Sequence, residues 1–189
     1  MRYSALPTYS TLLSHYPDKH SVPTKQLLDS IGGQVRKQLD DSVNTCATRI
    51  SQALNDSGQP IRRMPALYQV SGALPPKQRH QPQRPAKLYV IRVLDMKRYL
   101  ETNYGSGRLI YDATKEPRAL VNLPAQTQGV IVFVWSGPYS QFGAFGHVDL
   151  FRLWPNDKQP PRLEPACAGE CHWWTVGGPM TAFLWETSR

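Results

Sequence analysis

The run GVIVFVW at residues 129–135 constrains the fold of this 189-residue chain more than any other segment. It is continuous, apolar and rich in β-branched side chains, which is typical of a strand that is buried on both faces. The segment HVDLFRLW at 147–154 alternates between apolar and polar residues and predicts a second strand. We therefore expect a sheet in the second half of the chain.

Helices are predicted in the first half, where apolar residues recur at helical spacing. The segment 24–41 has this spacing but is broken by the glycine pair at 32–33. A second helix starts at residues 44–46 and ends near 55–58. Further predicted elements are a helix at 95–105, strands at 87–93, 172–176 and 181–186, and proline-rich loops at 59–86 and 155–166. Helices followed by strands indicate an α+β fold with an antiparallel sheet.

The length of the chain favours a single domain. Residues 1–24 are polar and contain three prolines, so we expect an arm or loose cover there and one domain, carrying the functional site, at 25–189. The N-terminus has no continuous apolar stretch of signal-peptide length, and we expect no export by the general route. No apolar run is long enough to predict a membrane span.

The chain has 22 Lys and Arg against 14 Asp and Glu, a net charge of +8. Such a surface attracts polyanions, among them nucleic acid, anionic lipid and cell-wall polymer. The densest basic patch, residues 75–87, contains no acid, and we interpret it as a solvated loop stiffened by proline. Nucleic-acid binding through this patch is a weaker alternative, because no nucleic-acid-binding motif accompanies it.

Two of the three cysteines, Cys167 and Cys171, are close enough in sequence to form a local disulfide. The same spacing would suit a metal with His172 as a third ligand. No second pair of ligands completes a zinc site, however, so we expect no metal and no cofactor. A disulfide would mean that the protein works in an oxidising compartment. Cys46 then remains as the unpaired thiol.

Cys46 lies in the first turn of the second predicted helix. Free N–H groups and the helix dipole stabilise negative charge there, so a cysteine in such a position forms a nucleophilic thiolate more readily. The alternative is that Cys46 packs as a small apolar side chain in a non-catalytic module that binds the cell wall or another protein. A catalytic cysteine also needs a base and a group that orients the base.

His147 is the best candidate for the base, because it opens a predicted strand directly after the glycine-rich turn FGAFG. The orienting group is either Asp149, two residues along the same strand face, or Glu170, in the turn between the two later cysteines. Asp149 as an ordinary exposed strand residue is a further alternative. Asn44, together with the backbone N–H of Cys46, is a candidate donor to an oxyanion.

Several segments stand in an order that is typical of a known family: IGGQVRKQL, NTCATRISQALNDSGQPI, YQVSG, KLYVIRVLDMKRYL, GVIVFV, GHVDLF, CAGECHWW and TAFLWE. On these segments the chain resembles family four of the type VI secretion amidase effectors, papain-like cysteine peptidases related to NlpC-type cell-wall hydrolases. The resemblance covers about residues 30–186. Three features in combination support the resemblance: the predicted helix that begins near Cys46, the strand predicted after the sequence GHV, and the turn between Cys167 and Cys171.

The resemblance implies a papain-like fold with N-terminal helices on an antiparallel sheet, Cys46 as nucleophile, His147 as base, and a disulfide between Cys167 and Cys171. It implies hydrolysis of the amide between D-glutamate and meso-diaminopimelate in peptidoglycan stem peptides. It also implies synthesis in the producer cytoplasm, delivery by the type VI secretion machinery into the periplasm of a target cell, and a cognate immunity protein that blocks the active site.

The chain departs from the family at one position that bears on the mechanism. An acid stands midway between the paired cysteines in the family, whereas this chain has Gly169 there, with Glu170 beside it. The orienting residue therefore stays open between Asp149 and Glu170. The stretches 75–87 and 155–166 are also longer than the family core needs, and they either contact substrate or immunity protein or are plain insertions.

Overall fold

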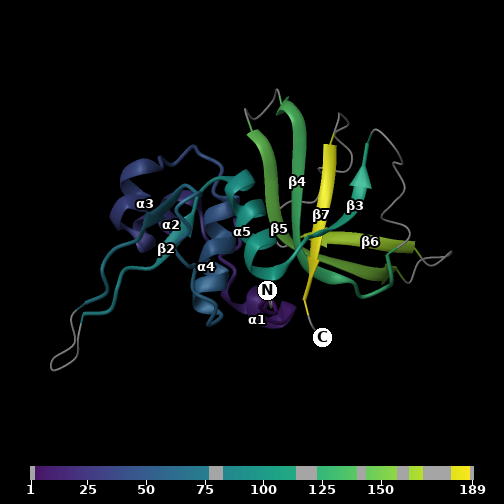
Figure 1. The fold of residues 1–189 in the computed structure, drawn as a ribbon, viewed down its shortest axis with the longest axis horizontal. Coiled ribbons are helices and arrows are strands. Elements are labelled where there is room, and N and C mark those ends of the chain that lie inside the picture. Colours follow the sequence, from purple (N-terminus) through teal and green to yellow (C-terminus); the bar gives the residue numbers. More distant parts are fainter. Residues whose placement is uncertain are drawn as a thin grey trace.

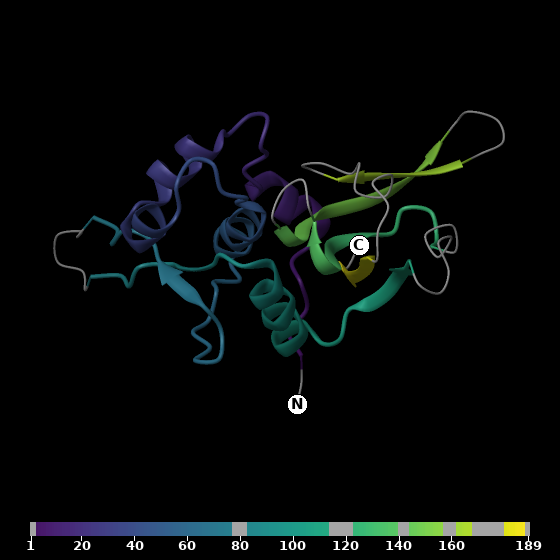
Figure 2. The ribbon, with the colours of Figure 1, turned by 90° about the horizontal axis from the view of Figure 1, so that it is seen from above.

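The computed structural model describes residues 3–76, 83–113, 123–139, 144–156, 162–167 and 180–187. Helices and a two-stranded sheet lie on one side of the molecule, and a five-stranded sheet lies on the other (Figure 1 and Figure 2). The helices are α1 (Tyr9–His15), α2 (Thr24–Ile31), α3 (Gly33–Gln38), α4 (Cys46–Asp56) and α5 (Val93–Tyr104). The strands are β1 (Gln69–Ser71), β2 (Leu88–Val90), β3 (Arg108–Asp112), β4 (Gln128–Tyr139), β5 (Ala144–Asn156), β6 (Arg162–Cys167) and β7 (Met180–Glu186). The predicted α+β class is confirmed.

Strand β4 is the centre of the larger sheet, whose order is β3-β7-β4-β5-β6 with antiparallel neighbours throughout. Residues 130–133 of β4 are fully buried. Val130 and Val132 belong to the core shared with the helices, while Ile131 and Phe133 belong to a second core formed by the sheet itself. The prediction that this run is a strand buried on both faces is confirmed.

Strand β5 carries His147 and Asp149, the two polar residues that the sequence singled out on one strand face. Its antiparallel register with β4 places His147 opposite Phe133 and Asp149 opposite Ile131. Among the described residues, β6 pairs with β5 only at 151–156, beyond the part that holds these two side chains. Both α4 and α5 pack against β5.

Helix α4 joins the two halves of the molecule, because it packs on α1, β2 and β5. Its apolar face is fully buried, as its spacing predicted, and consists of Ala47, Ile50, Ala53 and Leu54. The hydroxyl of Ser51 donates to the carbonyl of Val90 at 3.1 Å and accepts from the N–H of Val90 at 3.0 Å. These bonds fix α4 to β2 and so hold its first turn in one place.

The glycine pair at 32–33 separates α2 from α3, as predicted. Gly32 and Gly33 have φ angles of 61° and 60°, which lie in the left-handed region that favours glycine. A Cβ placed on Gly33 would lie 2.2 Å from the carbonyl carbon of Gly72. Only glycine fits at residue 33, since both the backbone conformation and the close approach exclude a side chain.

The prediction of a proline-rich loop at 155–166 is wrong at both ends, because residues 155–156 belong to β5 and β6 begins at Arg162. This strand lies at the edge of the sheet, and an edge strand tolerates a residue such as Pro165 that lacks an N–H donor. Helix α5 begins at Val93, two residues before the predicted start, and ends at Gly105 as expected. The strand predicted at 172–176 lies outside the described residues.

The segment predicted to be an arm or loose cover contains α1. Leu12 of this helix is fully buried, and Tyr9 is 6% exposed. Both belong to the same core cluster as Cys46. Residues from the start of the chain thus pack against α4, while the domain boundaries drawn at residues 24 and 25 stay a prediction. Among the described helices, none has the length and hydrophobicity of a membrane span.

Candidate active site

Cys46 is the first residue of α4 and is 4% exposed. Its backbone N–H donates to Oδ1 of Asn44 at 3.0 Å, so Asn44 provides the side-chain acceptor at the start of the helix. Thr45, which directly precedes the helix, makes no side-chain capping bond. The two members of the predicted oxyanion pair, Asn44 and the N–H of Cys46, are thus hydrogen-bonded to each other in this structure.

His147 is 7% exposed and lies beside Phe133, with ring centroids 6.2 Å apart and ring planes at 28°. The residue before it, Gly146, lies where two elements come close together. A Cβ on Gly146 would lie 2.6 Å from the carbonyl oxygen of Phe133 and 2.8 Å from Cγ1 of Val93. Glycine therefore allows the close approach between β5 and α5 that sets the position of His147.

The pKa of His147 is raised from 6.5 to about 9 by its surroundings. Burial alone would lower it, but a negative charge on Cys46, hydrogen bonds with Asp149 and Cys46, and the charge of Asp149 together outweigh burial. The imidazole consequently keeps its proton at neutral pH. The structure brings Cys46, His147 and Asp149 together, although roughly a hundred residues separate the cysteine from the other two.

Asp149 is completely buried, which rules out the alternative of an ordinary exposed strand residue. Its Oδ2 lies 3.5 Å from Nε2 of His147. Its Oδ1 accepts the backbone N–H of Leu150 at 2.7 Å. A buried carboxylate is costly unless it is paired, and here it meets a protonated imidazole. The carboxylate of Asp149 therefore lies where it can form an ion pair with His147.

Arg49 is a buried charged residue near the site, on the same helix as Cys46. It is 3% exposed, and its Nε donates to Oγ1 of Thr45 at 3.1 Å. Its Nη1 donates to the carbonyls of Pro17 and, at 2.9 Å, of Val22. No local pattern could have revealed these partners, because they belong to a segment about thirty residues earlier in the chain.

The positive charge of Arg49 interacts with ionisable groups of the candidate site. Burial lowers the pKa of Arg49, and electrostatic interactions with four neighbours oppose that change: Tyr16, Asp18, Cys46 and Asp149. Nη2 of Arg49 has no hydrogen-bond partner within the part of the chain that the structure describes. A buried cation therefore stands near both the thiol and the carboxylate.

The family model for Tae4, described as type VI secretion system (T6SS) amidase effector protein 4, matches residues 42–163. The chain belongs to the Tae4 family. The matched segment spans more than half of the chain and contains Cys46, His147 and Asp149. A comparison with curated proteins gives no match.

Solved structures of Tae4 proteins have the same fold as this chain. The effector Tae4 from Salmonella typhimurium, in complex with the immunity protein Tai4 from Enterobacter cloacae, is 25% identical, with a TM-score of 0.67 over 96% of this chain and 99% of that chain. A Tae4 of an effector–immunity system from Salmonella typhimurium is 26% identical over the same shares, with a TM-score of 0.64. Tae4 of the Tae4–Tai4 complex from Enterobacter cloacae, 24% identical over both full chains with a TM-score of 0.67, supports the fold.

Membership in the Tae4 family confirms the resemblance on which the sequence analysis relied. It makes the chain a type VI secretion amidase effector, which is delivered to target cells. The family thus favours an amidase over a module that only binds, and the buried charged partners of Cys46 agree with that choice. The papain-like character of the predicted fold is consistent with the Tae4 structures.

Several predicted features lie outside the described residues: Glu170, Cys171, the side chain of Cys167, and residues 77–82 of the basic patch. The disulfide therefore stays a prediction. Within the described patch, Lys87 forms an ion pair with Asp56. Among the described residues, no three His, Cys, Asp or Glu side chains gather where they could hold a metal ion.

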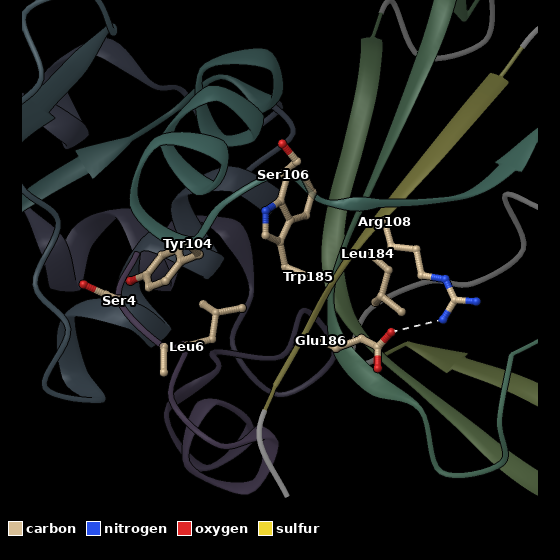
Figure 3. A pocket seen from close by; sticks show the side chains of 9 residues that line it. Ser4, Leu6, Tyr104, Ser106, Arg108, Leu184, Trp185 and Glu186 are labelled. Carbon is tan, nitrogen blue, oxygen red and sulfur yellow. Dashed lines mark hydrogen bonds and ion pairs between the residues drawn. The ribbon is translucent and has the colours of Figure 1, made fainter. Parts of the chain in front are cut away.

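A cavity of about 320 Å³ lies apart from the candidate site, between the N-terminal segment, the end of α5 and strands β3 and β7 (Figure 3). Its wall includes Trp185, whose Nε1 donates to the carbonyl of Gly105 at 2.7 Å. At one side Arg108 pairs with Glu186 at 3.4 Å (Figure 3). The residues that line it contain no cysteine and no histidine. The cavity therefore lacks the cysteine–histidine pair that a cysteine nucleophile needs.

Proposed function

We propose that the chain is a cysteine amidase that hydrolyses the amide between D-glutamate and meso-diaminopimelate in peptidoglycan stem peptides. One observation carries the proposal: Cys46 at the start of α4 lies beside a buried His147 whose pKa is about 9, with Asp149 next to it. A charged imidazole beside a thiol is the pairing that a cysteine nucleophile needs. The family name supports the amidase reaction class.

The geometry supports a two-step mechanism. The proton held on His147 leaves Cys46 as a thiolate, and its sulfur attacks the carbonyl carbon of the amide. N–H donors, with the amide group of Asn44 as one candidate, stabilise the resulting oxyanion. His147 then gives its proton to the leaving nitrogen, and the C–N bond breaks. Neutral His147 next takes a proton from water, which hydrolyses the thioester and restores the thiolate, while Asp149 keeps the imidazole oriented.

The family and the charge of the chain support a setting for this reaction. We propose that the type VI machinery delivers the chain into the periplasm of a rival cell, where peptidoglycan is accessible. The net charge of +8 would favour approach to anionic wall polymer. Two of the solved Tae4 structures that this chain matches are effector–immunity complexes with Tai4. We propose that a cognate immunity protein blocks the active site of this chain in producing cells.

Digestion of purified peptidoglycan tests the proposal. Wild type should yield fragments with new D-glutamyl carboxyl ends and a free amino group on meso-diaminopimelate, read by mass spectrometry. Cys46→Ala should yield none, and Cys46→Ser, which keeps the size of the side chain but lacks the thiol, should also yield none. Comparable products from Cys46→Ala would overturn the nucleophile, and cleavage at a different bond would overturn the substrate.

A second pair of variants tests the orienting residue, for which we propose Asp149 because it lies beside Nε2 of His147. Asp149→Asn should reduce the rate of hydrolysis by at least roughly 100-fold, since a neutral amide orients and stabilises an imidazolium poorly. Glu170→Gln should leave the rate within twofold of wild type. The opposite pattern would move the orienting role to Glu170.

A further inference from the structure

Arg92 and Tyr68 form a charged platform on the surface that the proposed mechanism does not use. The guanidinium carbon of Arg92 lies over the ring of Tyr68, 4.2 Å from the ring centroid, a distance at which the cation and the ring attract each other. Arg92 is exposed, and Tyr68 is 41% exposed. The hydroxyl of Tyr68 donates to Oε1 of Gln38 at the end of α3. The platform therefore presents an oriented positive charge to solvent.

No acid of this chain neutralises the charge of Arg92. Within the part of the chain that the structure describes, Arg92 forms no ion pair. The acid closest to it in sequence, Asp95, lies 4.0 Å from Arg98. The planar N–H donors of a guanidinium match both oxygens of a carboxylate, and they stay available when the group stacks on a ring. The platform is therefore suited to a ligand that carries a carboxylate.

The platform lies close to the candidate active site. Arg92 directly precedes α5, and Cγ1 of the next residue, Val93, lies 2.8 Å from where a Cβ on Gly146 would be. Gly146 in turn precedes His147, so the Cα atoms of Arg92 and His147 are at most about 15 Å apart. Figure 1 shows α5 beside β5, the strand that carries His147. A substrate held at His147 can therefore reach the platform.

The proposed mechanism indicates which half of the substrate faces this side. His147 gives its proton to the leaving nitrogen, and in the proposed reaction that nitrogen belongs to meso-diaminopimelate. Groups next to His147 consequently face the leaving half of the stem peptide. The side chain of meso-diaminopimelate ends in a second carboxylate, roughly 7 Å from the leaving nitrogen when extended. A side chain as long as that of Arg92 can span the remaining distance.

We propose that Arg92, supported by Tyr68, binds the carboxylate at the end of the meso-diaminopimelate side chain and so selects this residue over lysine. Lysine has the same side-chain amine but lacks the carboxylate. The inference rests on the proposed function, because it names a contact with the substrate of the same site. It places a determinant of specificity in the helical half of the molecule, apart from the three residues that carry out the chemistry.

The test uses two synthetic stem tetrapeptides that differ only in this carboxylate, one with meso-diaminopimelate and one with L-lysine at the third position. The readout is the ratio of kcat/KM for the first peptide to kcat/KM for the second. Arg92→Gln should lower this ratio at least tenfold, because a charged donor to the carboxylate is lost. Arg98→Gln is the matched control, since Arg98 is also exposed, lies on α5 and removes the same charge. It should leave the ratio within twofold of wild type.

A second pair of variants tests the supporting ring. Tyr68→Leu removes the surface on which the guanidinium of Arg92 lies, and the ratio should fall at least threefold. Tyr68→Phe keeps the ring and should retain a higher ratio than Tyr68→Leu. An equal or lower ratio in Tyr68→Phe would contradict the role of the ring.

Binding measurements separate failure of this inference from failure of the proposed function. In Cys46→Ala, which lacks the nucleophile, calorimetry should give a Kd at least fivefold lower for the diaminopimelate peptide than for the lysine peptide. Adding Arg92→Gln should remove this difference. If the difference depends on Arg92 but wild type hydrolyses neither peptide, the proposed function fails and the binding site stands.

Three results would overturn the inference. The first is a Cys46→Ala protein that binds the two peptides equally or binds neither. The second is a preference for diaminopimelate that persists in Arg92→Gln. The third is an equal loss of the ratio in Arg98→Gln, which would show an effect of total charge rather than a contact with Arg92.

Discussion

The charge on His147 depends on the thiol beside it, and removing that thiol gives a quantitative prediction. The pKa of His147 rises from 6.5 to about 9 in the folded protein, which corresponds to about 3 kcal/mol in favour of the charged imidazole. Burial works against this charge, so the attraction of Cys46 and Asp149 must exceed that figure. The charge of Cys46 is the largest of the contributions that raise the pKa.

Cys46→Ala removes both the charge and the hydrogen bond of the thiol but leaves burial and Asp149 in place. We expect the pKa of His147 to fall by at least one unit, or about 1.4 kcal/mol. The pKa of His147 in the folded wild type lies above 6.5, the ordinary value for histidine. The charged imidazole therefore stabilises the folded state fully below pH 6.5, and this stabilisation is lost as the pH rises through 9. In the variant the loss should occur at lower pH.

NMR titration of histidine-labelled protein between pH 5 and pH 10.5, in wild type and Cys46→Ala, measures this effect. The signal of His147 is identified by its absence in His147→Gln. A wild-type His147 that titrates near 6.5 would refute the charged pair. Equal titration of His147 in wild type and Cys46→Ala would show that the thiol does not hold the proton on the imidazole.

Two more variants test the scaffold through urea unfolding. Arg49→Ala should lower the free energy of unfolding by about 2–4 kcal/mol, since the partly buried carbonyls of Pro17 and Val22 lose their donor. A loss below about 0.5 kcal/mol would contradict the idea that Arg49 holds this turn against α4. Gly33→Ala should cost about 3 kcal/mol or more, because φ is 60° and the new Cβ would meet the backbone of Gly72. Gly58→Ala is the control, because Gly58 has a φ of 81° but open space around it, and this variant should cost only about 1 kcal/mol. Equal losses of unfolding free energy in the two glycine variants would mean that the clash with Gly72 does not occur.

The sequence correctly predicts those helices and strands whose formation depends on residues that are close together in the chain. The continuous apolar run at 129–135 predicts β4, because only a strand covered on both faces makes such a composition favourable. The glycine pair at 32–33 marks the break between α2 and α3. Asn44 next to Cys46 marks the start of α4 through a capping bond that spans two residues. Each of these causes lies within a few residues of its effect.

The parts that could not be predicted depend on contacts between distant segments. Proline in the segment 155–166 indicates a loop, and only the position of β6 at the sheet edge makes a strand acceptable there. Helical spacing puts Arg49 on a polar face, yet the chain that covers this face comes from residues 17–22. For Asp149, alternation along the strand fits both burial and exposure, and the packing of α1 and α4 against β5 decides between them.

The meeting of Cys46 with His147 and Asp149 has a consequence for how the folding of this chain can be followed. About a hundred residues separate the cysteine from the other two, and closing such a large loop is a late and slow event in folding. A collapsed intermediate that formed only the helical half would carry the thiol but lack the imidazole. The time at which Cys46 reaches its native labelling rate during refolding should therefore report the completion of tertiary structure. It should come later than the recovery of the far-ultraviolet circular dichroism signal, which reports helix formation.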